Sequence, residues 1–368
     1  MQTRTLAFVG CLNREAPYFQ GARGRGIAVF DFDEATGRLA PLAEQAGIDN
    51  PTFLIPHPSE PLLYATSEVF GWNEGLVTAY RVDAASGTLR YINKQATLGS
   101  ITAHGSLDHR HAHLLIANYS HGEVGETPGQ AVAVLRLRGD GGLEAAHCSA
   151  AHEGSGPHPE RQGAPHPHCA LASPDDRFVL VSDLGTDSIV AYRYDAASGE
   201  LGDGTACRLP PGSGPRHLAF HPDGTRLYVI NELSSTIAVL AYDAATAGLR
   251  VLQIVSAVPD GFAGENHCAD LHVSADGRFL YGSNRGHDSI VVHAIEGEGL
   301  RLVGHVPTGG STPRSFALDP LGHFLLAANQ NGDSVVVFRL DAASGMPQRI
   351  GDVAIGTPMC IRLARVAG

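Results

Sequence analysis

The chain has 368 residues, of which 43% are hydrophobic, and it carries a formal net charge of −12. The acidic balance and the lack of a basic stripe argue against nucleic-acid binding, because nothing would neutralise a phosphate backbone. No apolar run approaches the ~20 residues of a membrane-spanning helix, so no membrane partner is expected.

Arginine carries nearly all of the positive charge, since Lys94 is the only lysine. Guanidinium groups gathered at one mouth of the fold would suit bidentate recognition of a small carboxylate or phosphate. The six cysteines are scattered, at positions 11, 148, 169, 207, 268 and 360, and form no CxxC pair. Because Met1–Thr5 leads directly into an apolar run and not into a signal peptide, we predict reduced, mostly buried thiols in a cytoplasmic protein.

A polar turn motif repeats along the chain. Asp-Ala-Ala-Ser-Gly-x-Leu stands at 83–89 and 195–201, and its start recurs at 341–345. Variants begin at Asp33, Gly139, Asp243 and Glu296, which makes seven copies. The copies lie roughly 50 residues apart, the period of a propeller blade, and each follows an alternating strand pattern. The motif is therefore interpreted as the turn between the two outer strands of a repeat.

A hairpin pattern precedes most copies of this turn. In its clearest form, Leu218–Phe220 and Leu227–Ile230 are predicted strands joined by the Pro-Asp-Gly turn at 222–224. A tight turn of this kind makes an antiparallel pair. The residues before the first strand, Arg216 and His217, are therefore expected beside Glu232, which follows the second strand.

Four strands in each of seven repeats predict an all-β fold, a seven-bladed β-propeller, as a single domain over 1–368. The N-terminal run Leu6–Val9 resembles the second strand of a repeat. Its missing inner strand is expected near the C-terminus, at 358–364, so that one blade is closed by both ends of the chain. This closure would remove two exposed sheet edges.

The hairpin argument, applied to every repeat, collects polar residues on one face of the ring. Those before first strands are His104, His166, His168, Arg216, His217, His267 and Arg314. Those after second strands are Asn13, Glu68, Asn118, Asp183, Glu232, Arg285 and Gln330. Two long insertions, at 119–130 and 147–167, are expected to overhang the same face, and the second contains Arg161.

These residues leave several chemistries open. The histidines could hold a metal, but no Cys/His set has a recognised ligand spacing, so we predict no metal and no cofactor. No Gly-x-Ser-x-Gly elbow is present, which argues against a serine nucleophile. Taken singly, each arginine could equally form a structural salt bridge between blades. Three arginines at equivalent positions, 216, 285 and 314, favour binding of an anion.

Several separated motifs resemble one known family. They are Gly-Pro-Arg-His-Leu-Ala-Phe-His-Pro-Asp-Gly (214–224), Asn-Glu-Leu (231–233), Ser-Asn-Arg-Gly-His-Asp-Ser-Ile (283–290), Ala-Ala-Asn-Gln-Asn (327–331), and Arg161-Gln162 followed by Pro165-His-Pro-His. They are similar to those of the seven-bladed lactonase family, which comprises propeller-type 6-phosphogluconolactonases and fungal carboxy-cis,cis-muconate lactonising enzymes.

The resemblance implies site residues and an activity. The family's catalytic set of one His, two Arg and one Glu falls on His168, Arg216, Arg285 and Glu232. Further residues expected to bind substrate are His166, Arg161, His217, His267, Arg314 and Gln330. The implied reaction is hydrolysis of a small sugar lactone, foremost 6-phosphogluconolactone, by His/Glu-assisted water attack with Arg stabilisation. The alternatives are a carboxymuconate cyclase and a non-catalytic ligand-binding propeller, and the oligomeric state stays open.

Overall fold

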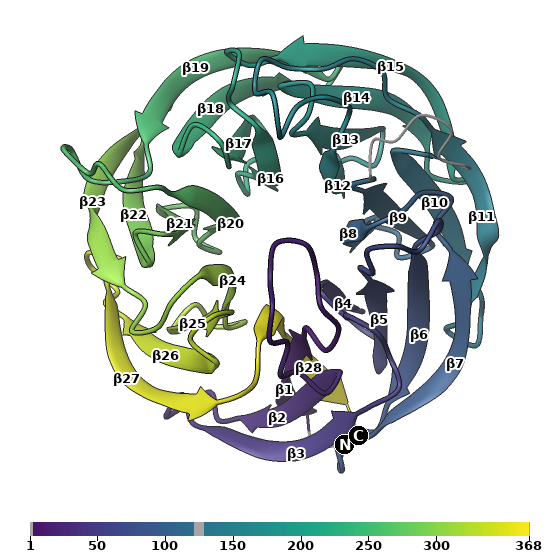
Figure 1. The fold of residues 1–368 in the computed structure, drawn as a ribbon, viewed down its shortest axis with the longest axis vertical. Coiled ribbons are helices and arrows are strands. Elements are labelled where there is room, and N and C mark those ends of the chain that lie inside the picture. Colours follow the sequence, from purple (N-terminus) through teal and green to yellow (C-terminus); the bar gives the residue numbers. More distant parts are fainter. Residues whose placement is uncertain (1–2, 121–128, 368) are drawn as a thin grey trace.

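The computed structural model describes residues 3–120 and 129–367. Its 28 strands form seven four-stranded antiparallel sheets, arranged as the blades of a ring (Figure 1). From the innermost strand outwards, the first four blades are β28 (Pro358–Ala367), β1 (Thr3–Cys11), β2 (Ile27–Phe32), β3 (Leu39–Gln45); β4 (Leu54–Pro56), β5 (Leu62–Ser67), β6 (Leu76–Val82), β7 (Leu89–Ala96); β8 (Thr102–Leu107), β9 (His113–Asn118), β10 (Val132–Leu137), β11 (Leu143–Ala150); and β12 (Pro167–Ala172), β13 (Phe178–Asp183), β14 (Ser188–Asp195), β15 (Glu200–Arg208). The other three are β16 (Pro215–Phe220), β17 (Arg226–Asn231), β18 (Thr236–Asp243), β19 (Gly248–Ser256); β20 (His267–Val273), β21 (Phe279–Arg285), β22 (Ser289–Glu296), β23 (Gly299–Pro307); and β24 (Pro313–Leu318), β25 (Phe324–Asn329), β26 (Ser334–Leu340), β27 (Pro347–Ala354).

The hydrophobic core lies between neighbouring blades. The second strand of a blade is covered on both faces, and β5, β9, β13 and β25 are buried along their whole length. Tyr64, Tyr228 and Tyr281 occupy equivalent second strands and are fully buried. The outermost strands, such as β15, are mostly exposed. Burial therefore decreases from the inner part of each blade to its outer edge, and the packing between blades holds the seven blades around a central channel.

The repeated motif forms the turn between the third and fourth strand of each blade, as predicted. In the copy at 83–88 the carboxylate of Asp83 accepts hydrogen bonds from the backbone N–H groups of Ala85 and Ser86, at 3.1 and 2.9 Å. Gly87 then adopts a φ of +72°, which a residue without a Cβ adopts without strain. The side chain of Asp83 thus replaces backbone partners in the turn.

The predicted closure of the ring is confirmed. β28 is the innermost strand of the blade that contains β1, and the two pair from Thr3↔Ala367 to Cys11↔Pro358. Both ends of the chain therefore hold one blade together. In the part of the chain that the structure describes, no helix is long and apolar enough to span a membrane.

Two features of the ring position the site. Each inner strand occupies the same place in its blade, so the first residues of all inner strands line one end of the channel. The loop of residues 12–26, between β1 and β2, extends from its blade toward the middle of the ring (Figure 1, dark purple).

Candidate active site

A bulge at the start of the inner strands aims three predicted residues at the channel. In β12, β16 and β24 the pairing register with the second strand shifts across the second residue. The residues left unpaired are His168, Arg216 and Arg314. A β-bulge turns a side chain out of the regular alternation and is frequent beside active sites. Equivalent blades therefore present an imidazole and two guanidiniums to one end of the channel.

Glu232 forms the centre of an arginine cluster at this end. It directly follows β17 and is buried. Its Oε2 lies 3.0 Å from Nε of Arg216 and 2.8 Å from a terminal nitrogen of Arg285, and its Oε1 lies 2.6 Å from a terminal nitrogen of Arg161. The hairpin of β16 and β17 brings Arg216 and Glu232 together, as predicted from the sequence. Arg161 reaches them from the 147–167 insertion, which overhangs this end as expected.

The three guanidiniums decide the charge state of Glu232. Burial alone would raise the pKa of its carboxyl, but Arg285, Arg161 and Arg216 outweigh burial and hold that pKa well below its usual range. Burial, reinforced by Arg285 and Arg314, lowers the pKa of Arg216. Glu232 is therefore held as a carboxylate among three guanidiniums.

A second acidic residue, Glu68, pairs with the fourth arginine, Arg314. Arg314 lies 3.6 Å from Oε1 of Glu68, and its guanidinium stacks over the ring of Tyr18 at 5.3 Å. The Tyr18 hydroxyl donates to Oε1 of Glu68 at 3.0 Å, and the Thr52 hydroxyl donates to Oε2 at 2.7 Å. Tyr18 comes from the loop of residues 12–26, of which only Asn13 was expected at this face.

His168 lies beside the arginine cluster as a neutral imidazole. Its side chain is buried, and its Nδ1 has no hydrogen-bond partner among residues 3–120 and 129–367. Burial, Arg216 and His217 lower the pKa of His168 well below its ordinary value. No hydrogen bond joins His168 to Glu232 among the described residues, and the carboxylate of Glu232 pairs with three guanidiniums instead.

His217 lies one step deeper in the channel and has both ring nitrogens engaged. Its Nδ1 is 2.8 Å from Oδ1 of Asp270, and its Nε2 is 3.1 Å from a terminal nitrogen of Arg216. Burial, followed by Arg216, lowers the pKa of His217 to about 4, against the opposing effect of Asp270. This pattern fits a neutral ring that donates to Asp270 and accepts from Arg216. His217 thus has no free nitrogen for a water molecule.

The other predicted substrate-binding residues divide into two groups. His166 stacks on Tyr119 with ring centroids 4.3 Å apart, and the Tyr119 hydroxyl lies 3.4 Å from Arg161, which joins both rings to the cluster. The ring of His267 instead pairs with the exposed Glu265 at 3.0 Å.

Gln330 is buried, and its Oε1 has no hydrogen-bond partner among the described residues. None of the described contacts joins its side chain to the cluster. Of the 119–130 insertion, residues 121–128 lie outside the described residues. Within the described ranges, no three His, Cys, Asp or Glu side chains come together as metal ligands would.

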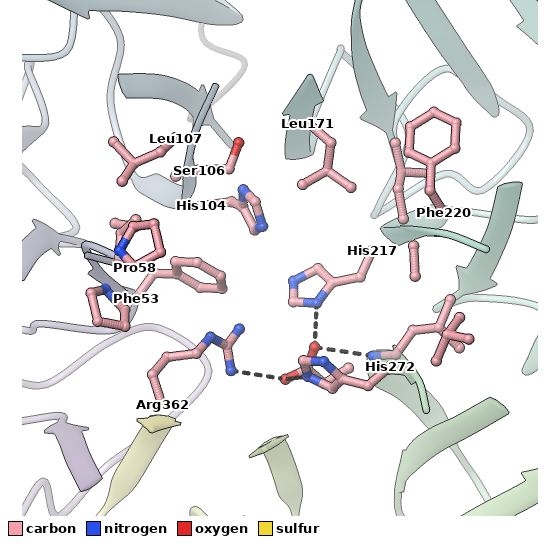
Figure 2. Close-up of a pocket in the computed structure, with 18 of the residues that line it drawn as sticks. Phe53, Pro58, His104, Ser106, Leu107, Leu171, His217, Phe220, His272 and Arg362 are labelled. Atoms are coloured by element: carbon pink, nitrogen blue, oxygen red, sulfur yellow. Dashed lines mark hydrogen bonds and ion pairs between the residues drawn. The ribbon is translucent and has the colours of Figure 1, made fainter. Parts of the chain in front are cut away.

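The other end of the channel holds a cavity of about 510 Å³, lined by the later residues of the inner strands (Figure 2). Its floor is Asp270, which pairs with His217 and, at 3.5 Å, with Arg362. The Arg362 guanidinium stacks over Phe53 at 4.7 Å. Toward the arginine end, a small cavity of about 10 Å³ lies between Glu68, Arg216 and Arg314. The arginine cluster and this cavity thus lie at opposite ends of the channel.

Comparison with known proteins identifies the family to which this fold belongs. The family model described as "Lactonase, 7-bladed beta-propeller" matches residues 7–363. A 6-phosphogluconolactonase of Bacillus subtilis is 35% identical over 98% of both chains, and one of Formosa agariphila is 34% identical over 93% of this chain and 94% of the relative. The solved structure of the periplasmic gluconolactonase of Pseudomonas aeruginosa is 36% identical and covers 100% of both chains with a TM-score of 0.89. This chain therefore belongs to the seven-bladed β-propeller lactonase family.

Proposed function

We propose that this protein hydrolyses the ring ester of an anionic sugar lactone, with 6-phosphogluconolactone as the preferred substrate. The observation that carries the proposal is the excess of buried positive charge around His168. Names of relatives support the reaction class, since two of them are 6-phosphogluconolactonases and a third is a gluconolactonase. These names differ in whether the lactone carries a phosphate group. The positive charge of the site favours a phosphorylated lactone.

Four guanidiniums in the cluster face only two carboxylates. The guanidiniums are those of Arg161, Arg216, Arg285 and Arg314, and the carboxylates are those of Glu68 and Glu232. The side chains of Arg216, Arg314 and Arg285 are 3%, 11% and 14% exposed, so solvent neutralises them poorly. The next pair inward, Asp270 with Arg362, is balanced. A ligand with about two negative charges, as a phosphate monoester has, would neutralise the excess.

His168 is proposed as the general base. A neutral imidazole with a free nitrogen takes a proton from water while the water oxygen attacks the lactone carbonyl carbon. The carbonyl oxygen becomes an oxyanion, and the carbon becomes tetrahedral. When the carbonyl re-forms, the bond to the ring oxygen breaks and His168 returns the proton to that oxygen. The product is an open-chain hydroxy acid, which ionises and releases one proton.

The arginines divide two tasks in this proposal. His168 and Arg216 stand at the same bulge position of the inner strands β12 and β16, and Arg216 adds to burial in lowering the pKa of His168, so we assign Arg216 to the oxyanion. A well-placed donor of this kind contributes ~3 kcal/mol to transition-state binding. Arg285 and Arg314 hold the phosphate, and Glu232 fixes the relative positions of Arg161, Arg216 and Arg285.

The test is an activity panel on the purified protein. It compares 6-phosphogluconolactone, plain gluconolactone and carboxymuconate, each corrected for its spontaneous reaction. We expect a kcat/KM for the phosphorylated lactone at least ~100-fold above that for the plain one, the equivalent of about 3 kcal/mol. Equal rates would contradict the charge argument, turnover of carboxymuconate alone would favour the cyclase, and no turnover would favour a binding protein.

We also propose a cytoplasmic location. All six cysteines lie within the described ranges and are free thiols, four of them buried. Thiols persist most readily in a reducing compartment. The Pseudomonas relative is named as periplasmic, so fractionation of the source cells with an antibody against this protein is the deciding measurement. Recovery with a periplasmic marker would contradict the proposal.

A further inference from the structure

We propose that Asp270 and His217 form a positioning pair that holds Arg216 in place for catalysis. The inference rests on the proposed function, because it assigns how the oxyanion-stabilising guanidinium is oriented. Neither residue of the pair needs to touch the substrate. Asp270 was not among the residues expected at the site, and His217 was expected only as a substrate contact.

The carboxylate of Asp270 is fixed from several blades. It lies on β20 and is 1% exposed. Its Oδ1 accepts from the backbone N–H of Leu271 at 3.0 Å, and its Oδ2 accepts from the Ser315 hydroxyl at 3.0 Å and the Phe316 N–H at 3.2 Å. Arg362 and His272 also approach Oδ2, at 3.5 and 3.4 Å. With four blades contributing, the carboxylate has little freedom to move.

This fixed carboxylate determines the tautomer of His217. The Oδ1 of Asp270 can only accept, so the Nδ1 at 2.8 Å must carry the ring proton. The lone pair of Nε2 then faces Arg216, whose terminal nitrogen lies 3.1 Å away and can only donate. Figure 2 shows the ring of His217 between the other residues of the channel, with its bond to the carboxylate drawn as a dashed line.

Arg216 has two further anchors that complete the geometry. The same terminal nitrogen donates to the backbone oxygen of Ala269 at 2.7 Å, and Nε donates to Glu232 at 3.0 Å. Ala269 directly precedes Asp270 in the bulge of β20, where the register shifts between Cys268 and Leu271. One short segment of β20 therefore positions Arg216 both directly and through His217.

The substitution Asp270→Asn tests the pair with almost no change in shape. The amide oxygen best replaces Oδ2, where several donors converge, so the amide NH₂ faces Nδ1 of His217. The ring proton must then move to Nε2, where it opposes the donor of Arg216. We expect kcat for the lactone to fall ~10–100-fold, as for a misplacement of about 1 Å, with a smaller change in KM. The double variant Asp270→Asn/His217→Ala should lose no more than the worse single variant, because the pair acts as a unit.

A matched control exists outside the site. Asp108 and His113 form the same kind of buried pair, with Oδ2 and Nδ1 3.1 Å apart, and their further partner is Tyr194. Asp108→Asn should lower thermal stability while leaving kcat unchanged. If Asp108→Asn and Asp270→Asn lose activity to the same extent, Asp270 is merely structural and the proposal is wrong.

A direct measurement separates this proposal from the proposed function. Two-dimensional ¹H–¹⁵N NMR of histidine-labelled protein, assigned with His217→Gln, reports the tautomer of His217 with no substrate present. We expect the Nδ1–H form in the wild type and its loss in Asp270→Asn. A wild-type Nε2–H form, or a tautomer unchanged in Asp270→Asn, overturns the pair even if the lactonase assay succeeds. If the wild type shows the expected tautomers but hydrolyses none of the lactones, the proposed function is wrong, while the hydrogen-bonded pair of Asp270 and His217 is still supported.

If Asp270→Asn fails to fold, His217→Gln tests the same proposal. The NH₂ group of the glutamine amide can donate to Asp270, and its oxygen can accept from Arg216. We expect this variant to retain several-fold more kcat than His217→Ala. Equal losses in the two variants would overturn the pair.

Discussion

His168 is the residue whose replacement should affect turnover most. His168→Ala is expected to lower kcat by ~10²–10⁴ while the fold stays intact, because general-base assistance contributes about that factor. His168→Gln should not restore it, since an amide cannot take the proton. Activity in His168→Ala together with a dead Glu232→Gln would make the glutamate the base. The three guanidiniums on Glu232 argue against that outcome.

The pH profile of kcat/KM also tests the assignment of His168 as the general base. Burial and neighbouring positive groups lower the pKa of His168, so the neutral base persists to more acidic pH than a free histidine would allow. Activity should therefore fall as the pH decreases through a value below 6.5, and the limb should be absent from the residual rate of His168→Ala. An acidic limb above 6.5 would contradict this environment.

Arg285 tests the role of guanidinium geometry. Its Nε and a terminal nitrogen donate to the carbonyl oxygens of His267 and Cys268, at 3.2 and 3.1 Å, while it also pairs with Glu232. Arg285→Lys keeps the charge but loses the planar fork, and should cost ~1.5–3 kcal/mol in kcat/KM for the phosphorylated lactone. Arg301→Lys, on the exposed strand β23, is the matched control. Unchanged kcat/KM in Arg285→Lys would exclude Arg285 from the site.

At the level of elements, the loop of residues 12–26 carries a prediction of its own. Tyr18 connects this loop to Glu68 by a 3.0 Å hydrogen bond and to Arg314 by stacking. Tyr18→Phe keeps the stacking but loses the hydrogen bond, worth about 1 kcal/mol, so KM should rise ~5-fold with little change in kcat. Tyr91→Phe, on the outer strand β7, should leave KM unchanged. An equal KM in both variants would mean that the loop does not shape the site.

The level of structural elements also explains which features could be predicted from the sequence. The hairpin and turn motifs are local, so they gave the blades, the closure and the neighbourhood of Arg216 and Glu232. Bulges in the inner strands break the alternation of side chains, and the bulge of β20 lacks the proline that precedes the bulged residue in β12, β16 and β24. Asp270 therefore looked like an ordinary strand residue, although the bulge of β20 places its carboxylate between His217 and Arg362. The path of a long loop is equally non-local, which is why Tyr18 was missed.

At the scale of the whole molecule, stability should depend on the strand that closes the ring. β28 pairs with β1 over nine residue pairs. It also buries Cys360 and Ile361 in the core and brings Arg362 to Asp270. A chain that ends at residue 357 should lose its cooperative thermal transition, because β1 would be left as an open inner edge. A chain that ends at residue 364 keeps six of the nine pairs and the contacts of Cys360, Ile361 and Arg362, and should still unfold cooperatively. A folded chain ending at residue 357 would show that closure is dispensable.

The buried histidines of the channel make stability depend on pH. The pKa of His217 in the folded protein is about 4, below the ordinary 6.5, so the unfolded chain binds more protons between these values. Stability is therefore greatest above pH ~6.5 and decreases as the pH falls toward 4, by about 3 kcal/mol for this ring alone. Below that range Asp270 and Glu232, whose pKa values are held well below the usual range, lose their contribution as they are protonated.

Urea unfolding at pH 7.5, 6.5, 5.5 and 4.5 measures this dependence. We expect the free energy of unfolding of the wild type to fall at each step below pH 6.5. His217→Gln is less stable at pH 7.5 but has no ring to protonate, so its curve should be flatter between pH 6.5 and 4.5. The difference between the two curves isolates the contribution of His217, since the other titrating groups are common to both proteins. Parallel curves would show that His217 has the same pKa folded and unfolded, and would contradict its place between Asp270 and Arg216.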